Sequence, residues 1–162
     1  MSSYSHLLKQ SDIFYQFTAA QLDLVSPLCR EAEFQAGQLV FPENANSTDL
    51  YIIVRGVVDV VISASAGPDE PESSTLARLR RGQSFGEIAL VDQGLRSASA
   101  RAVEDETRLL LIPREQLLIL CEAYPQLGFR LMYNLAADLA MKIRNADFRF
   151  REQQLRSSSG SG

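Results

Sequence analysis

The chain contains few of the residues on which most catalytic and metal sites depend. One of its 162 residues is histidine and two are cysteine. His6 lies in a polar N-terminal segment, so the sequence predicts neither a zinc site nor a serine–histidine catalytic pair. Cys29 and Cys121 stand in apolar, helical contexts without metal or redox spacing, which favours two buried thiols. We therefore expect no enzyme activity, no metal and no cofactor.

Long apolar segments and a secretory leader are also missing. The longest apolar clusters, residues 50–54 and 57–62, have the length of strands and are interrupted by charge. The N-terminus has no basic start followed by an apolar stretch. The sequence therefore predicts a cytoplasmic chain without a membrane-spanning segment. Its net charge of −4 argues against nonspecific binding to nucleic acid.

The hydrophobic period divides the chain into three parts. Residues 12–31 have helical spacing, with Thr18 as a candidate N-cap. Residues 32–113 change to short strands separated by glycine, proline and asparagine turns, as in an antiparallel sandwich or jelly roll. Residues 114–156 return to helix, with prolines at two helix starts. We expect an α+β, mainly β fold: an antiparallel β jelly-roll barrel with N-terminal helices and a long C-terminal helix.

Part of the strand region departs from regular alternation. Residues 66–74 are polar and rich in proline and glycine, which predicts a mobile surface loop, with a tolerated insertion favoured over a functional lid. Leu76 and Leu79 cannot share one face of a regular strand, so a strand irregularity is expected there. The arginines beside them, interpreted as a solvated edge that discourages edge pairing, are Arg78, Arg80 and Arg81.

The last helix carries an apolar stripe with a repeat of four residues. Its members are Leu127, Leu131, Leu135, Leu139 and Ile143, with Met132, Ala136 and Ala140 beside them. The first half is interpreted as a core face, while for the outer half we favour self-association as a homodimer over intramolecular packing. Cations at the end of this helix complement its dipole, and contact with a partner protein or nucleic acid is the second interpretation. The domain is expected to span residues 1–156, followed by a flexible tail at 157–162.

The most informative segment places a carboxylate and a guanidinium nine residues apart. Glu87 opens a candidate helical turn that ends at Val91, and the first N–H groups of such a turn suit an anion. Gly86 and Ala89 let a ligand approach the backbone closely. Arg96 adds planar donors that match a phosphate, and Glu87 adds an acceptor for hydroxyl groups. An anion next to a diol describes a ribose phosphate.

A surface salt bridge between Glu87 and Arg96 is the alternative interpretation of this segment. Such a pair contributes at most about 1 kcal/mol to stability. It leaves the ordered set of small residues around the two charges unexplained. We therefore favour the ligand site.

The same segment resembles the phosphate-binding cassette of cyclic nucleotide-binding domains. The matching residues are Phe85, Gly86, Glu87, Ile88, Ala89, Leu90, Arg96, Ser97, Ala98, Ser99 and Ala100. Residues 34–41 and 49–56 resemble earlier strands of these domains, which occur in catabolite activator proteins, protein kinase A regulatory subunits and cyclic nucleotide-gated channels. The resemblance covers roughly residues 12–155. The chain departs from it at Leu95, where proline is frequent, and at 43–46, where asparagine replaces glycine and tolerates the same left-handed conformation.

The resemblance implies a role for each cassette residue. Glu87 would accept a hydrogen bond from the ribose 2′-hydroxyl, and Arg96 would pair with the cyclic phosphate. Backbone amides around Gly86, Ala89 and Ser97 would complete the phosphate cradle, and the Ser97 hydroxyl would add a donor. The other residues assigned to the ligand site are Phe85, Ile88, Leu90 and Ala98. The candidate base contacts on the last helix are Met141, Lys142, Arg144 and Asn145.

The resemblance implies a cyclic mononucleotide sensor. Ser97 beside Arg96 resembles bacterial cyclic AMP receptors, so we favour cyclic AMP over cyclic GMP as the ligand. Occupancy would repack Leu90 against a hinge at residues 125–129, and the last helix would pass the change to an unidentified effector protein or a homodimer. Transcription factors of the family continue into a helix-turn-helix after the last helix. This sequence ends there, so we expect no DNA-binding domain in it. The alternative is a protein-interaction module with the same fold and a silent or repurposed pocket.

Overall fold

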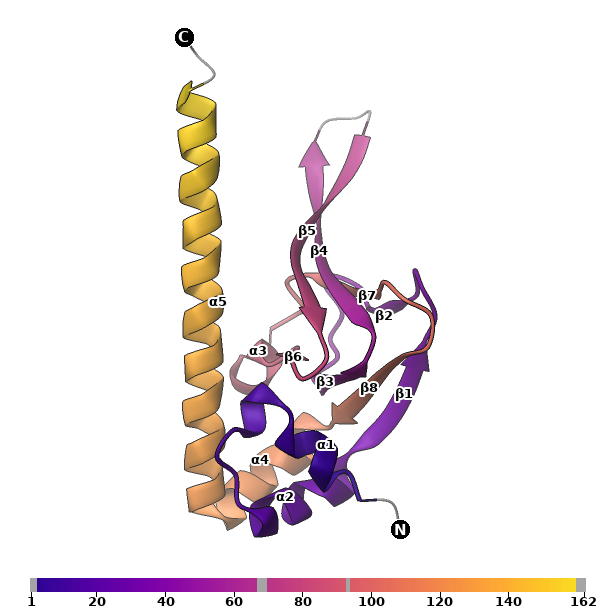
Figure 1. Ribbon diagram of the computed structural model, residues 1–162, viewed down its shortest axis with the longest axis vertical. Coiled ribbons are helices and arrows are strands. Elements are labelled where there is room, and N and C mark those ends of the chain that lie inside the picture. The colour runs from indigo at the N-terminus through magenta and orange to yellow at the C-terminus, as the bar shows by residue number, and fades with distance from the viewer. Residues whose placement is uncertain (1–2, 67–69, 93, 160–162) are drawn as a thin grey trace.

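Two four-stranded antiparallel sheets form the centre of a computed structural model, which describes residues 3–66, 70–92 and 94–159 (Figure 1). In the first sheet the order is β1 (Arg30–Phe34), β8 (Thr107–Ile112), β3 (Leu50–Arg55) and β6 (Ser84–Phe85). In the second it is β2 (Leu39–Phe41), β7 (Ser99–Ala102), β4 (Val57–Ala66) and β5 (Glu70–Arg80). The paired strands run antiparallel. The predicted antiparallel roll is confirmed.

Helices precede and follow the strands, as the hydrophobic period predicts. Before the sheets come α1 (Ser5–Lys9), η1 (Asp12–Phe14), α2 (Ala19–Val25) and η2 (Ser26–Leu28), and after them α4 (Arg114–Ala123) and α5 (Pro125–Ser159). Thr18 is the N-cap of α2, and it forms a capping box with Gln21. Two boundaries differ from the prediction: α1 lies before the expected helices, and β1 begins at Arg30, within the segment expected to be helical.

The sequence of β3 is an almost continuous apolar run because both faces of the strand are buried. Leu50 and Ile52 face the core cluster shared with the helices, whereas Tyr51 and Ile53 belong to the cluster between the two sheets. Successive side chains of a strand point to opposite faces, so both faces of β3 are covered. The strand thereby joins the helical layer to the interior of the roll, beside the segment that carries Glu87.

The prediction of a loop at residues 66–74 is wrong for most of these residues, which belong to strands. Strands β4 and β5 form a long hairpin in which Ser65 pairs with Pro71, and residues 67–69 lie outside the described part of the chain. Proline is tolerated there because β5 is the edge strand of its sheet. The predicted irregularity is confirmed: consecutive Val60 and Val61 pair with Ala77 and Thr75, a β-bulge at Leu76. Leu76 is accordingly exposed while Leu79 is buried, and the arginines at 78, 80 and 81 are exposed as expected.

Helix α5 packs on the roll with its first half and extends beyond it with the second (Figure 1). Leu127, Leu131 and Leu135 are buried in the core, whereas Ile143, the last member of the stripe, is 62% exposed. The buried Asn134 donates hydrogen bonds to the backbone carbonyls of Ile13 and Tyr15, at 3.0 and 2.8 Å. The helix continues through residues 157–159, three residues into the predicted tail, and residues 160–162 lie outside the described part.

Both cysteines pack at the edge of the helical core and are half-buried, less than predicted. Burial raises the pKa of the Cys29 thiol to about 12 and also raises the pKa of Cys121. A protonated thiol is a weak nucleophile and a weak metal ligand, which agrees with the structural role assigned from the sequence.

Candidate functional site

The cassette lies between β6 and β7, at the side of the roll that α5 crosses (Figure 1). Phe85 ends β6, Gly86 adopts a φ of 76°, and Glu87 is the N-cap residue of the short helix α3 (Ile88–Val91). Burial separates the predicted residues into two groups, apart from Gly86, which is half-buried. The buried ones are Phe85, Glu87, Ala89, Leu90, Arg96 and Ala98, and the exposed ones are Ile88 and Ser97.

Arg96 is held on three sides by groups of the protein. Its Nη1 and Nη2 atoms donate to the backbone carbonyls of Gly86 and Asp49 at 3.0 and 2.8 Å, and Nε donates to Ser47 Oγ at 3.2 Å. The guanidinium carbon lies 4.2 Å from the centre of the Phe41 ring. A guanidinium has five N–H groups, so this arrangement fixes its plane and leaves two of them for an incoming acceptor.

The charge of Arg96 is buried without an acidic partner. The residue is 6% exposed, and no carboxylate within the described residues forms an ion pair with it. Burial lowers the pKa of Arg96, and nearby Tyr51, Asp49 and Glu87 offset only part of that effect. The site therefore lacks the close negative charge that would compensate for the desolvation of the guanidinium.

A tight backbone loop supports the position of Arg96. The Arg96 amide donates to the Ala45 carbonyl, and the Arg96 carbonyl accepts from the Asn44 amide, both at 2.8 Å. Asn44 has a φ of 69°, the left-handed conformation expected of an asparagine that replaces glycine. The segment before β3 and the cassette are thus joined on both sides of the arginine.

Glu87 does not pair with Arg96, which rules out the surface salt bridge considered from the sequence. Instead Glu87 Oε1 accepts a hydrogen bond from Lys142 Nζ of α5 at 2.8 Å. The Lys142 ammonium also donates to the Ser84 carbonyl at 3.1 Å and lies 3.0 Å from Asp138 Oδ2. Burial alone would lower the pKa of Lys142, but Glu87 and Asp138 outweigh it and raise the pKa above its ordinary value.

Lys142 is the residue whose role the sequence did not predict. The expected base contact of Lys142, Met141, Arg144 and Asn145 stays a prediction, and the last three are exposed on α5. The sequence contains one signal for the contact of Lys142 with the roll. Asp138 and Lys142 are four residues apart and form a charged pair beside the apolar stripe of the helix. Such a pair on the packed side of a helix indicates a polar contact across the interface.

The backbone amides of the proposed phosphate cradle are only partly available. The Ala89 amide donates to the Gly86 carbonyl at 3.3 Å, and the Leu90 amide donates to the Glu87 carbonyl at 3.0 Å. The bond from Ala89 is long, so it is weaker than a typical backbone hydrogen bond. Leu90 is 1% exposed and lies in the same core cluster as Leu127 at the start of α5.

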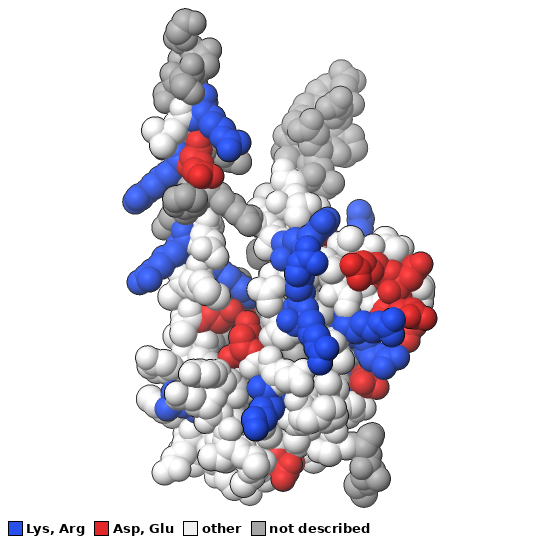
Figure 2. Space-filling model, in the orientation of Figure 1, with Lys and Arg blue, Asp and Glu red and all other residues white. Residues whose placement is uncertain are grey.

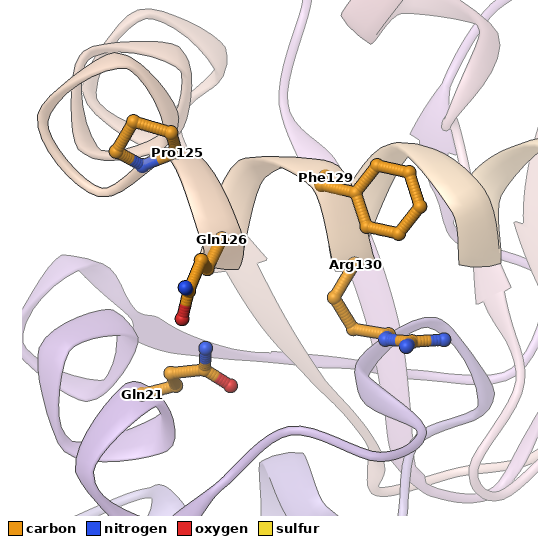
Figure 3. A pocket seen from close by; sticks show the side chains of 5 residues that line it. All are labelled: Gln21, Pro125, Gln126, Phe129 and Arg130. Carbon is orange, nitrogen blue, oxygen red and sulfur yellow. The ribbon is translucent and has the colours of Figure 1, made fainter.

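Two clefts elsewhere on the surface offer less chemistry than the cassette. One, of about 420 Å³, is lined by Gln21, Pro125, Gln126, Phe129 and Arg130, and Figure 3 shows the two glutamine side chains pointing toward each other. The neighbouring cleft adds Tyr15 and Tyr133. Phe129 is 65% exposed, so these are open surfaces, and they contain no buried unpaired charge comparable to Arg96.

The part of the chain that the structure describes contains neither a metal-binding cluster nor a membrane-spanning helix. It holds no group of histidine, cysteine, aspartate or glutamate suited to a metal ion. None of its helices is long and apolar enough to cross a membrane. The expectations of no cofactor and of a cytoplasmic location stay predictions.

Comparison with known proteins supports the resemblance seen in the cassette. The family model described as the cyclic nucleotide-binding domain matches residues 31–124. The chain is 35% identical over 140 residues to the cyclic AMP receptor protein of Thermus thermophilus, across 86% of this chain and 61% of that protein. It is 33% identical over 88 residues to the human cGMP-dependent protein kinase 2, across 54% of this chain and 11% of the kinase.

The same relationship holds in three dimensions. The crystal structure of the Thermus thermophilus catabolite activator protein superposes with a TM-score of 0.74 at 33% identity, across 89% of this chain and 63% of that one. An antiparallel roll followed by a long helix thus places the chain in a class of regulatory ligand-binding domains. The chain belongs to the cyclic nucleotide-binding domain family. It spans about three fifths of the length of the Thermus protein.

Proposed function

We propose that this chain is a receptor that binds a cyclic mononucleotide in the cassette, with the phosphate on Arg96. The observation that carries the proposal is the burial of that guanidinium without an ion-pair partner among the described residues. A buried cation destabilises the protein unless an opposite charge lies close to it. A cyclic phosphate supplies one negative charge and two free oxygens, which match the two remaining N–H groups of Arg96.

The ribose belongs on Glu87. This carboxylate is 4% exposed and lies nine residues before Arg96 in the same cassette. A buried carboxylate is a strong acceptor for a hydroxyl group. Glu87 and Arg96 carry opposite charges on one short segment, which suits a ligand with a free sugar hydroxyl on one side and a phosphate on the other.

Cyclic AMP is the favoured ligand. Ser97 is exposed next to Arg96, and the relative that aligns with 86% of this chain is named a cyclic AMP receptor protein. The match to a cGMP-dependent kinase covers a smaller part, 54% of the chain. Competition between the two nucleotides tests the preference. Cyclic GMP binding at least tenfold tighter, a difference of about 1.4 kcal/mol, would reverse it.

Calorimetric titration of an Arg96→Ala variant tests the site. Removing one partner of a buried charge pair typically costs about 2–5 kcal/mol of binding free energy, so we expect a large loss of affinity. Arg96→Lys should also bind weakly, because an ammonium cannot reproduce the planar fork of the guanidinium. Arg108→Ala is the control, since Arg108 forms a partly exposed pair with Glu33 on β1. Equal titration curves for the wild type and Arg96→Ala would eliminate the proposed site.

The second candidate function is a protein-interaction module with a repurposed pocket. One observation favours it: Arg96 and Glu87 each have protein partners already, namely two carbonyls and a hydroxyl for the first and Lys142 for the second. A folded wild-type chain that binds neither cyclic AMP nor cyclic GMP would support this alternative.

Transmission of occupancy through α5 is part of the proposal. Lys142 of α5 contacts Glu87 of the cassette, and Leu90 of the cassette packs in the cluster that contains Leu127 of α5. A ligand that changes these contacts would shift the equilibrium between positions of the helix. The recipient is a second copy of the chain in a homodimer or an effector protein that is not identified.

A further inference from the structure

The strongest unassigned feature of the molecule is a cluster of charges between the cassette and α5. Three carboxylates meet there, from Asp12 of η1, Glu87 and Asp138. Asp12 Oδ1 accepts a hydrogen bond from Ser84 Oγ at 3.1 Å, and the Ser84 carbonyl accepts from Lys142. Within the described residues, Lys142 is the cation that forms ion pairs in this cluster.

Lys142 has little freedom to move. Its ammonium donates hydrogen bonds to Glu87 and Ser84, and it forms an ion pair with Asp138, one helical turn earlier, at 3.0 Å. The Glu87 and Asp138 side chains are each 6% exposed. Both carboxylates lie within 3.0 Å of the Lys142 ammonium, whose positive charge therefore offsets the repulsion between the two negative charges.

Only one oxygen of the Glu87 carboxylate is used by the protein. Lys142 occupies Oε1, and Oε2 accepts no hydrogen bond from the described residues. An ionised carboxylate can accept several hydrogen bonds, two at each oxygen. A ribose hydroxyl can therefore bind Oε2 while Lys142 stays on Oε1.

We infer that Lys142 is a positioning residue that orients the Glu87 carboxylate for the ribose 2′-hydroxyl, with Asp138 holding the ammonium in place. The inference rests on the proposed function. It adds that selectivity for a ribose over a 2′-deoxyribose depends on a residue of α5 that acts through Glu87. A fixed carboxylate binds the hydroxyl more tightly than a mobile one, because less side-chain entropy is lost on binding.

Binding of cyclic AMP and of its 2′-deoxy analogue to the same variants tests the inference. A hydrogen bond to a charged group predicts that the wild type prefers cyclic AMP about tenfold or more. In Lys142→Met we expect the preference to fall to about twofold or less, chiefly through weaker binding of cyclic AMP. Arg96→Ala should weaken both ligands and keep the preference. Lys9→Met, which changes the chain's other lysine, exposed on α1, should alter neither.

A second variant covers the case in which Lys142→Met does not fold. Lys142→Met combined with Asp138→Asn removes one positive and one negative charge together, and it should lose the preference in the same way. An unchanged preference in the folded variant overturns the inference, and so does tighter binding of cyclic AMP, which would mean that Lys142 competes with the ribose. A wild type that binds neither ligand overturns the proposed function and this role together. A wild type that binds with a preference insensitive to Lys142 overturns this role alone.

Discussion

At the scale of single residues, Arg96 and Gly86 depend on each other. The Gly86 carbonyl accepts from Arg96 Nη1, and a φ of 76° is required to present that carbonyl. A Cβ on residue 86 would lie 2.8 Å from Arg96 Nη1, closer than real Cβ contacts occur, and 3.0 Å from the Asp49 carbonyl oxygen, which is tighter than most of them. Glycine at this position therefore serves both the backbone conformation and the space that the guanidinium occupies.

Gly86→Ala should lower the affinity for cyclic AMP as well as the melting temperature. Gly37→Ala is the matched control, because Gly37 has a φ of 85° but nothing lies within 4 Å of its added Cβ. Both variants incur the strain of a left-handed alanine, about 1–2 kcal/mol, and only Gly86→Ala also displaces Arg96. Titration calorimetry and thermal melts separate the two effects. Unchanged affinity in Gly86→Ala would show that the ligand does not depend on this position of Arg96.

The raised pKa of Lys142 predicts how the free energy of unfolding depends on pH. Its pKa is raised in the folded protein, so its contribution is fully present below the unfolded pKa of about 10.4 and is lost as the pH rises through the folded value. Its side chain is 32% exposed, so we expect Lys142→Met to be less stable by about 1–3 kcal/mol near pH 7. Urea unfolding of both proteins should show this difference shrinking above about pH 10.4. A difference that is constant across the alkaline range would contradict the charge contribution.

At the scale of elements, the sequence predicts most where a local rule decides the structure. Thr18 caps α2 because its side chain accepts a hydrogen bond from the Gln21 amide, which has no partner within the helix. The bulge at Leu76 is predictable because Leu76 and Leu79 cannot share one face of a regular strand. The hairpin at 66–74 was missed because proline and glycine indicate loops, whereas an edge strand tolerates Pro71.

The candidate site was predicted only in part for a related reason. The cassette is a continuous segment, so its glycine, glutamate and arginine can be recognised together. The contact between Lys142 and Glu87 joins residues 55 positions apart, and it depends on how α5 packs across the roll. The partners of Arg96 are mostly backbone carbonyls, which every residue has and which no sequence pattern marks.

Helix α5 carries a second apolar row on its exposed side. Phe129, Tyr133, Ala136, Ala140 and Ile143 follow one another in alternating steps of four and three residues, and all five are exposed. This spacing is typical of the seam of a coiled coil. It shares Ile143 with the stripe of every fourth residue expected from the sequence, but the first members of that stripe are buried in the core.

The exposed row predicts that α5 mediates the proposed homodimer. Ile143→Asp should shift the proposed dimer toward monomer, because a charge in a coiled-coil seam is strongly unfavourable. Ile119→Asp is the control, since Ile119 is similarly exposed, 66% against 62%, but lies on α4. Sedimentation equilibrium at several protein concentrations measures both variants. A wild type that remains monomeric throughout would refute dimerisation through this row.

At the scale of the whole molecule, charged side chains are distributed unevenly over the surface (Figure 2). On the face shown in Figure 2, Lys and Arg side chains are interspersed with Asp and Glu over the roll, while the part over the N-terminal helices is mostly uncharged. Two routes connect the cassette to α5: the polar contact of Lys142 with Glu87 and the apolar packing of Leu90 in the same cluster as Leu127. A ligand on the cassette can act on the helix through either route.

Hydrogen exchange with and without cyclic AMP distinguishes a switch from a simple binding protein. Because both routes end on α5, we expect ligand-dependent protection in residues 85–92 and also in 125–146. Leu90→Ala should reduce the change in α5 more than it reduces affinity, since Leu90 is 1% exposed and packs toward the helices. The substitution should also destabilise the fold by about 2–5 kcal/mol, so protection is compared at equal fractions folded. Protection confined to the cassette in the wild type would leave the chain a receptor without this switch. If Leu90→Ala instead abolishes binding while the fold survives, Leu90 belongs to the ligand pocket, and the polar route through Lys142 is the one that couples the nucleotide to α5.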